Sequence, residues 1–124
     1  SKILEMYSKK TGRLFEFSFS APFIIANSSI SKINFAKDFG LLFGLIFQIV
    51  DDLIDEIGTL KKIGKTPGKD LEQGKSTLLS MLGKENVINL CKSEINKFTL
   101  KHKKSFKKQK ILEYLLKFGM DRVN

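Results

Sequence analysis

Hydrophobic residues recur every three to four positions over most of the chain, which is the spacing of amphipathic α-helices. The first helical segment is ILEMYSKKTGRLFEFSFSAPFIIAN at 3–27. Pro22 is expected to bend it, because proline removes one helical hydrogen bond. A loop at 27–31 follows, with Ser31 as the expected N-cap of the next helix.

The second predicted helix is long and apolar and runs from residue 31 to about Ile57. Gly40 and Gly44 interrupt its apolar pattern and would let a neighbouring helix approach closely. Gly58 is a favourable residue for ending it.

The rest of the chain contains one predicted loop and three shorter helices. Residues 58–77 hold four glycines, one proline and five lysines, which predicts a structured loop. Helical spacing returns at about 76–82, 85–101 and 107–120. Because no segment alternates with a period of two, the predicted fold class is all-α.

An acidic stripe crosses the long helix where its apolar run ends. Gln48, Asp51, Asp52 and Asp55 are spaced i, i+3, i+4 and i+7, so they share one helix face. Like charges at i and i+4 repel, and buried carboxylates need partners. The stripe could be an ordinary solvated face, but the lysine-rich loop that follows it favours a positively charged partner above the aspartates.

The composition indicates which kind of partner the chain binds and in which cellular compartment it lies. The net charge of +9 implies an anionic partner such as a phosphorylated metabolite, nucleic acid or membrane surface. The second basic block, at 97–110, contains seven lysines and is interpreted as a solvated face, with His102 as another surface residue. Cys91 is the single cysteine, so it is expected to be a structural thiol in a reducing compartment, and the cytoplasm is the predicted location.

No membrane-spanning helix is predicted. The longest apolar stretch, FGLLFGLIFQIV at 39–50, has 12 residues and includes a glutamine, which suits a buried core helix. Stable membrane insertion is therefore not expected. Nucleic-acid binding is not expected either, because it would explain the net charge of +9 but not the acidic stripe. The chain begins at Ser1 within a helical pattern, and we expect it to be a fragment of a longer fold.

The residue types favour metal-assisted diphosphate chemistry. Carboxylate oxygens suit Mg²⁺, which prefers to be shared with substrate phosphates, and lysines contact the same phosphates as point charges. Lys10-Thr11-Gly12 on the first helix adds a cation and a hydroxyl. The segment GKDLEQGKS is not a nucleotide P-loop, because its Gly68–Gly74 spacing is one residue too long.

The run FQIVDDLIDEIGTLKKIGKTPGKDLEQGKST at 47–77 resembles the second aspartate-rich motif of the trans-isoprenyl diphosphate synthases, the farnesyl and geranylgeranyl diphosphate synthase family. All fixed positions of the pattern FQ-x-x-D-D-x-x-D and G-K-x-x-G-x-D-x-x-x-G-K-x-T are present. The KTG at 10–12 and the stretch at 114–122 resemble the same family. The resemblance implies that residues 1–124 are the C-terminal half of an isoprenoid-synthase helical bundle.

The resemblance also implies roles for individual residues. Asp51, Asp52 and Asp55 would bind Mg²⁺ at an allylic diphosphate, with Asp51 as the principal ligand. Thr11 and Gln48 would face the allylic carbon and stabilise developing positive charge. Phe47 would line the pocket for isopentenyl diphosphate. The expected diphosphate-binding lysines are Lys10, Lys65 and Lys75.

The implied activity is condensation of an allylic diphosphate with isopentenyl diphosphate to a short-chain prenyl diphosphate. The first aspartate-rich motif of the family is absent from these 124 residues, so the chain alone is expected to be inactive and to need the N-terminal half, in a homodimer. Two alternatives stay open: a non-catalytic subunit of a heteromeric synthase, and a terpene cyclase fragment. Retention of all three aspartates favours the synthase over both.

Overall fold

A computed structural model describes residues 2–63, 78–106 and 110–121, and within these ranges the chain is helical with no strand. The all-α prediction is therefore confirmed. The elements in chain order are α1 (Lys2–Tyr7), the π-helix η1 (Ser8–Gly12), α2 (Arg13–Ile25), α3 (Ile30–Ile63), α4 (Leu78–Leu82), α5 (Lys84–Lys101), α6 (Lys103–Phe106) and α7 (Lys110–Asp121).

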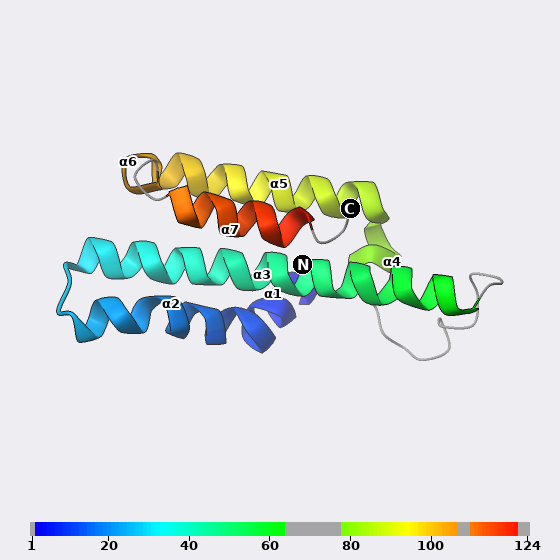
Figure 1. Ribbon diagram of the computed structural model, residues 1–124, viewed down its shortest axis with the longest axis horizontal. Coiled ribbons are helices and arrows are strands. Elements are labelled where there is room, and N and C mark those ends of the chain that lie inside the picture. The colour runs from blue at the N-terminus through cyan, green and yellow to red at the C-terminus, as the bar shows by residue number, and fades with distance from the viewer. Residues whose placement is uncertain (1, 64–77, 107–109, 122–124) are drawn as a thin grey trace.

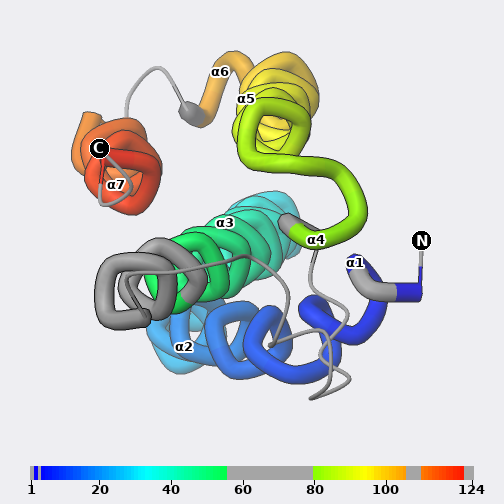
Figure 2. Tube along the Cα trace, turned by 90° about the vertical axis from the view of Figure 1, so that its right-hand side faces the viewer, coloured from blue at the N-terminus to red at the C-terminus, as the bar shows by residue number. Residues whose placement is uncertain are grey.

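The long helix α3 forms the centre of the molecule. Figures 1 and 2 show α2 along one side of α3 and the pair α5 and α7 along the opposite side. Helices α2 and α5 run antiparallel to α3, whereas α7 runs in the same direction (Figure 1). The first helix, α1, lies beside the middle of α3, and this arrangement brings residues 2–12 next to the second half of α3.

The core is built on the apolar side chains of α3. Phe39, Ile46 and Leu53, spaced by seven residues, are at most 2% exposed. Toward α2 the packing is aromatic: the Phe19 ring lies 4.9 Å from that of Phe39, and the Phe15 ring lies 5.1 Å from that of Phe43. Rings at these distances add about 0.5–1.5 kcal/mol per pair beyond their buried area. The phenylalanine-rich composition therefore serves the α2–α3 contact.

Helix α5 contributes Val87, Cys91 and Phe98 to the same core. Burial raises the pKa of the Cys91 thiol to about 11, so the thiol stays protonated and unreactive at neutral pH. This agrees with the expectation of a structural cysteine.

Helices α2 and α3 approach so closely that glycine is required on α3. A Cβ atom on Gly40 would lie 2.5 Å from the Phe15 carbonyl oxygen, and one on Gly44 would lie 2.8 Å from the Gly12 Cα atom. Both neighbours are backbone atoms, which cannot move without shifting the whole helix. The predicted role of these two glycines is confirmed.

Gly40→Ala is expected to destabilise the fold by about 1–3 kcal/mol, because overpacking against a backbone carbonyl outweighs the helix propensity gained by alanine. Gly119→Ala in α7 is the matched control, since its Cβ would lie an ordinary 3.6 Å from Ile46 Cγ2. Thermal unfolding monitored by circular dichroism should show a lower Tm for Gly40→Ala and an unchanged or higher Tm for Gly119→Ala. Equal Tm changes would contradict the close approach.

Two predicted boundaries of the long helix were wrong. Gly58 does not end it, since α3 continues to Ile63; one helical glycine costs only about 1 kcal/mol, which tertiary packing and the helix-forming residues after it can offset. Ser31 is not the N-cap, because α3 begins at Ile30 and the Ser29 carbonyl already accepts the amides of Lys32 and Ile33. The predicted loop at 58–77 lies outside the described residues from 64 onward.

Over Ile30–Asp55, α3 is long and apolar enough by composition to cross a membrane. The sequence prediction considered only the uninterrupted apolar run of 12 residues and so missed this longer window. However, 56% of the 18-residue apolar window within this span is buried inside the fold, between α2 on one side and α5 and α7 on the other. Burial in the core accounts for the apolar composition without a membrane.

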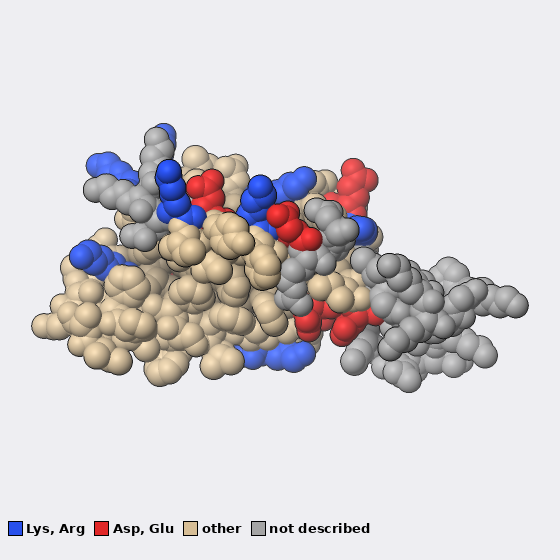
Figure 3. Space-filling view, in the orientation of Figure 1, with Lys and Arg blue, Asp and Glu red and all other residues tan. Residues whose placement is uncertain are grey.

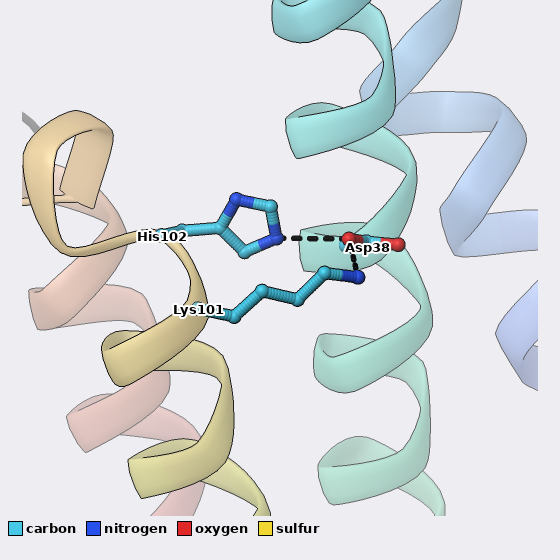
Figure 4. Close-up of polar contacts among 3 residues, drawn as sticks. All are labelled: Asp38, Lys101 and His102. Atoms are coloured by element: carbon cyan, nitrogen blue, oxygen red, sulfur yellow. Dashed lines mark hydrogen bonds and ion pairs between the residues drawn. The ribbon is translucent and has the colours of Figure 1, made fainter.

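The interpretation of His102 as a surface residue was wrong. Its ring lies 4.7 Å from the Phe98 ring, and its Nε2 lies 2.8 Å from Asp38 Oδ2 (Figure 4). Lys101 Nζ donates to the same oxygen at 2.7 Å. The contact joins the C-terminal end of α5 to α3, and a separation of 64 residues between His102 and Asp38 hides it from local sequence patterns.

Asp38→Asn should lower the free energy of unfolding by about 0.5–1 kcal/mol at neutral pH, because partly exposed ion pairs contribute only modestly to stability. Partial burial alone would raise the pKa of Asp38, but the hydrogen bonds and charges of Lys101 and His102 outweigh burial and lower it below 3.8. Because the pKa of Asp38 is lower in the folded chain than in the unfolded chain, its charged carboxylate stabilises the fold at any pH above the unfolded-state pKa. This stabilisation is lost as the pH falls through the folded-state pKa.

Thermal unfolding of wild type and Asp38→Asn should therefore differ at pH 7 and converge as the pH falls below 3.8. Glu94→Gln is the control, because among the described residues Glu94 forms its ion pair within α5, with Lys97 at 2.7 Å. A Tm difference for Asp38→Asn that does not shrink in acid would count against this assignment.

Candidate active site

The acidic stripe lies on the second half of α3 with graded exposure. Gln48 is 6% exposed, Asp51 and Asp52 are half-buried, and Asp55 is exposed. The stripe thus starts in the core and ends at the surface. Figure 3 shows acidic side chains gathered over this part of α3, at the lower edge of the molecule. The shared helix face predicted from the spacing is consistent with this gradient.

The π-helix η1 brings the Lys-Thr-Gly segment to the stripe. Gly12 is buried where η1 meets Gly44 of α3, and Gly44 lies one turn before Gln48. At that point Thr11 Oγ1 donates a hydrogen bond to Gln48 Oε1 at 2.7 Å. A π-turn carries an extra residue and is frequent at functional sites. Two motifs that are 37 residues apart in sequence therefore meet through side chains.

Two further hydrogen bonds extend this contact to Asp52. Gln48 Nε2 donates to Asp52 Oδ1 at 3.1 Å, and the Tyr7 hydroxyl donates to Asp52 Oδ2. Thr11, Gln48, Asp52 and Tyr7 thus form one continuous chain of hydrogen bonds between η1, α3 and α1. Tyr7 was missed in the sequence, where a tyrosine in an apolar helical pattern is indistinguishable from core.

Phe47 is half-buried and packs toward α2, its ring 5.4 Å from that of Phe15. It therefore forms part of the apolar wall next to the Thr11–Gln48 contact. No described contact tests the proposed pocket for isopentenyl diphosphate.

Of the three lysines predicted to bind the diphosphate, the structure describes one. Lys10 is exposed on η1, adjacent to Thr11, and lines a shallow hollow together with Lys9 and residues of α1. Lys65 and Lys75 lie outside the described residues. Their predicted contacts with a diphosphate stay predictions.

In the described ranges no group of three or more His, Cys, Asp or Glu side chains is arranged to hold a metal ion. Asp52 is engaged by Tyr7 and Gln48, while Asp51 and Asp55 lie one turn apart on α3. Two carboxylates so spaced offer hard oxygen ligands of the kind Mg²⁺ accepts when water and substrate phosphates complete its shell. The residues therefore fit a magnesium ion shared with a diphosphate better than one enclosed by protein.

An acidic stripe on the central helix of an all-α fold, beside a Lys-Thr-Gly segment, is the arrangement that the resemblance to the isoprenyl diphosphate synthases predicts. The sequence matches the family model for polyprenyl synthetase over residues 1–117, and the chain belongs to this family. It is 32% identical over 123 residues to the geranylgeranyl diphosphate synthase of Sulfolobus acidocaldarius. That alignment covers 95% of this chain and 36% of the relative, so the chain spans about a third of its length. No solved structure matches significantly.

Proposed function

We propose that this chain supplies one wall of the active site of a magnesium-dependent prenyl transferase, which condenses an allylic diphosphate with isopentenyl diphosphate to a short-chain prenyl diphosphate. The observation that carries the proposal is the Thr11–Gln48–Asp52 hydrogen-bond chain. It joins two motifs on different helices into one site, as the family resemblance requires. The family membership and the S. acidocaldarius relative support the same chemistry.

In the proposed reaction the C1–O bond of the allylic diphosphate breaks, and its electron pair leaves with the diphosphate. The double bond of isopentenyl diphosphate supplies the electron pair of the new C–C bond. The resulting cation then loses a proton to the departing diphosphate, and this loss restores a double bond in the product. The protein therefore needs charge stabilisation and positioning, and no nucleophilic side chain.

Each described residue has a specific task in this scheme. Asp51 and Asp55 would hold the magnesium, which when bound neutralises the leaving diphosphate. Asp52, which the resemblance also implied as a ligand, accepts hydrogen bonds from Tyr7 and Gln48 and is not assigned to the metal here. Lys10, exposed on η1 next to Thr11, would contact the diphosphate as a point charge. The Thr11 and Gln48 oxygens, which share a hydrogen bond, would face the allylic carbon and stabilise its developing positive charge. Phe47 would pack against the isopentenyl group.

The remaining proposals concern assembly and setting. The second wall of the site would come from an N-terminal half carrying the first aspartate-rich motif. Residues 1–124 would be the C-terminal part of the polyprenyl synthase domain. The complete enzyme would be a homodimer in the cytoplasm. Lys65 and Lys75 would complete the diphosphate contacts.

The test is to incubate the chain with an N-terminal half from the family, radiolabelled isopentenyl diphosphate, dimethylallyl diphosphate and Mg²⁺, and to separate labelled prenyl diphosphates by chromatography. The proposal expects labelled condensation product that disappears when EDTA is added. A complex that forms but makes no product would contradict it. The N-terminal half alone is the control.

A further inference from the structure

The contact between Tyr7 and Asp52 is not explained by the proposed chemistry. Tyr7 is 3% exposed, and its hydroxyl donates to Asp52 Oδ2, 45 residues away in sequence. Gln48 Nε2 donates to the other oxygen, Oδ1. Both carboxylate oxygens of Asp52 therefore accept hydrogen bonds from this chain.

A buried phenol needs such a partner. Leaving a buried hydroxyl without a hydrogen bond costs free energy, and bonds to an ionised acceptor are stronger than neutral ones. The Tyr7–Asp52 bond connects the last residue of α1 directly to α3, and the π-helix with Lys10 and Thr11 begins at the next residue. The contact thus fixes the point from which the Lys-Thr-Gly segment leaves α1.

The hydrogen bonds of Asp52 indicate its task. Asp52 is held by two donors from the chain, one at each carboxylate oxygen. An ion shared with a diphosphate needs carboxylate oxygens that can turn toward the substrate. A carboxylate bonded at both oxygens is suited to holding protein segments in place.

We propose that Tyr7 is a positioning residue that, through Asp52, holds the Lys10–Thr11 segment against α3, and that Asp52 keeps this bond when magnesium and diphosphate bind. This deepens the proposed function and rests on it for its catalytic meaning. The bond itself is a property of the fold and is testable without turnover.

Tyrosine fluorescence gives a direct readout, because the chain contains two tyrosines and no tryptophan. Tyr114 is 62% exposed, so Tyr114→Phe leaves Tyr7 as the single emitter with little effect on the core. A carboxylate that accepts the phenolic proton quenches tyrosine emission. In the Tyr114→Phe background, Asp52→Asn should therefore raise Tyr7 emission, and Asp55→Asn should leave it unchanged.

Mg²⁺ and inorganic diphosphate, added to the Tyr114→Phe chain at concentrations where isothermal titration shows that they are bound, should leave Tyr7 emission quenched. A rise would show that Asp52 leaves Tyr7 for the metal and would overturn the proposal. Equal emission in the Asp52→Asn and Asp55→Asn variants would overturn it as well, by showing that the bond does not form.

Kinetics of the assembled enzyme separate positioning from general stability. Tyr7→Phe keeps the ring and removes only the hydroxyl, so it should raise KM for the allylic diphosphate about tenfold, equal to ~1.4 kcal/mol, with a smaller change in kcat. Tyr114→Phe should change neither. An unchanged KM for Tyr7→Phe would refute the positioning role. If the fluorescence results hold and the wild-type assembly makes no product, the bond stands and the proposed function fails.

Discussion

Asp51→Asn is expected to lower kcat of the assembled enzyme by about 10²–10³-fold, while the fold is retained. Asparagine has nearly the shape of aspartate but no charge, so the substitution removes the proposed ligand of the magnesium ion that would neutralise the leaving diphosphate. Loss of one electrostatic group at a developing charge typically costs about 2.7–4 kcal/mol. Asp51 is half-buried on α3, where water screens charge less than at the open surface.

The control for this variant is Asp121→Asn, an exposed aspartate at the end of α7. It removes the same charge on a different helix from the stripe, so kcat should stay close to wild type. Initial rates with labelled isopentenyl diphosphate over a range of Mg²⁺ concentrations measure both variants. Equal losses of kcat would show that the effect is one of net charge and would refute the ligand role of Asp51.

The 124-residue chain alone is expected to show no prenyl transfer and only weak binding of allylic diphosphate, even with excess Mg²⁺. A diphosphate bound from one side stays open to water, where each charge contact is worth little. The apolar face of α2 is exposed as well, with Leu14 and Phe17 each about two-thirds accessible. Exposed apolar surface of this kind promotes association.

Isothermal titration of the chain with geranyl diphosphate and Mg²⁺, alongside the product assay, measures both parts of this expectation. The same measurements after an N-terminal half is added are the control, and affinity and turnover should both appear there. Turnover by the isolated chain would contradict the view that it carries one wall of the site.

Much of the fold could be predicted because long amphipathic segments carry strong periodic signals. The helices around Phe39, Cys91 and Leu116 follow from spacing alone, and Gly40 and Gly44 marked the close approach of α2. Helix ends were less predictable. Gly58 has the chemistry of a terminus, yet a terminus is decided by the balance between local propensity and tertiary packing.

Residues of the candidate site were singled out where residue type and spacing carry the information, and contacts between distant segments were missed. Gln48 and the aspartates share a face by helical geometry, and the resemblance paired them with Thr11. The contacts of Tyr7 and His102 were not predicted, because their partners, Asp52 and Asp38, are 45 and 64 residues away in sequence. Nothing in a local pattern distinguishes a tyrosine that bonds an aspartate from one that only packs.

The central claim is that the acidic stripe of α3 and the Lys10–Thr11 turn together bind an allylic diphosphate. The most direct test is a crystal structure of the assembled enzyme with Mg²⁺ and geranyl S-thiolodiphosphate, which resists ionisation. We predict a diphosphate between Asp51 and Lys10, a magnesium ion on Asp51, and the prenyl C1 atom beside the Thr11–Gln48 bond. A diphosphate bound elsewhere, with no metal contact from Asp51 or Asp55, would contradict the claim.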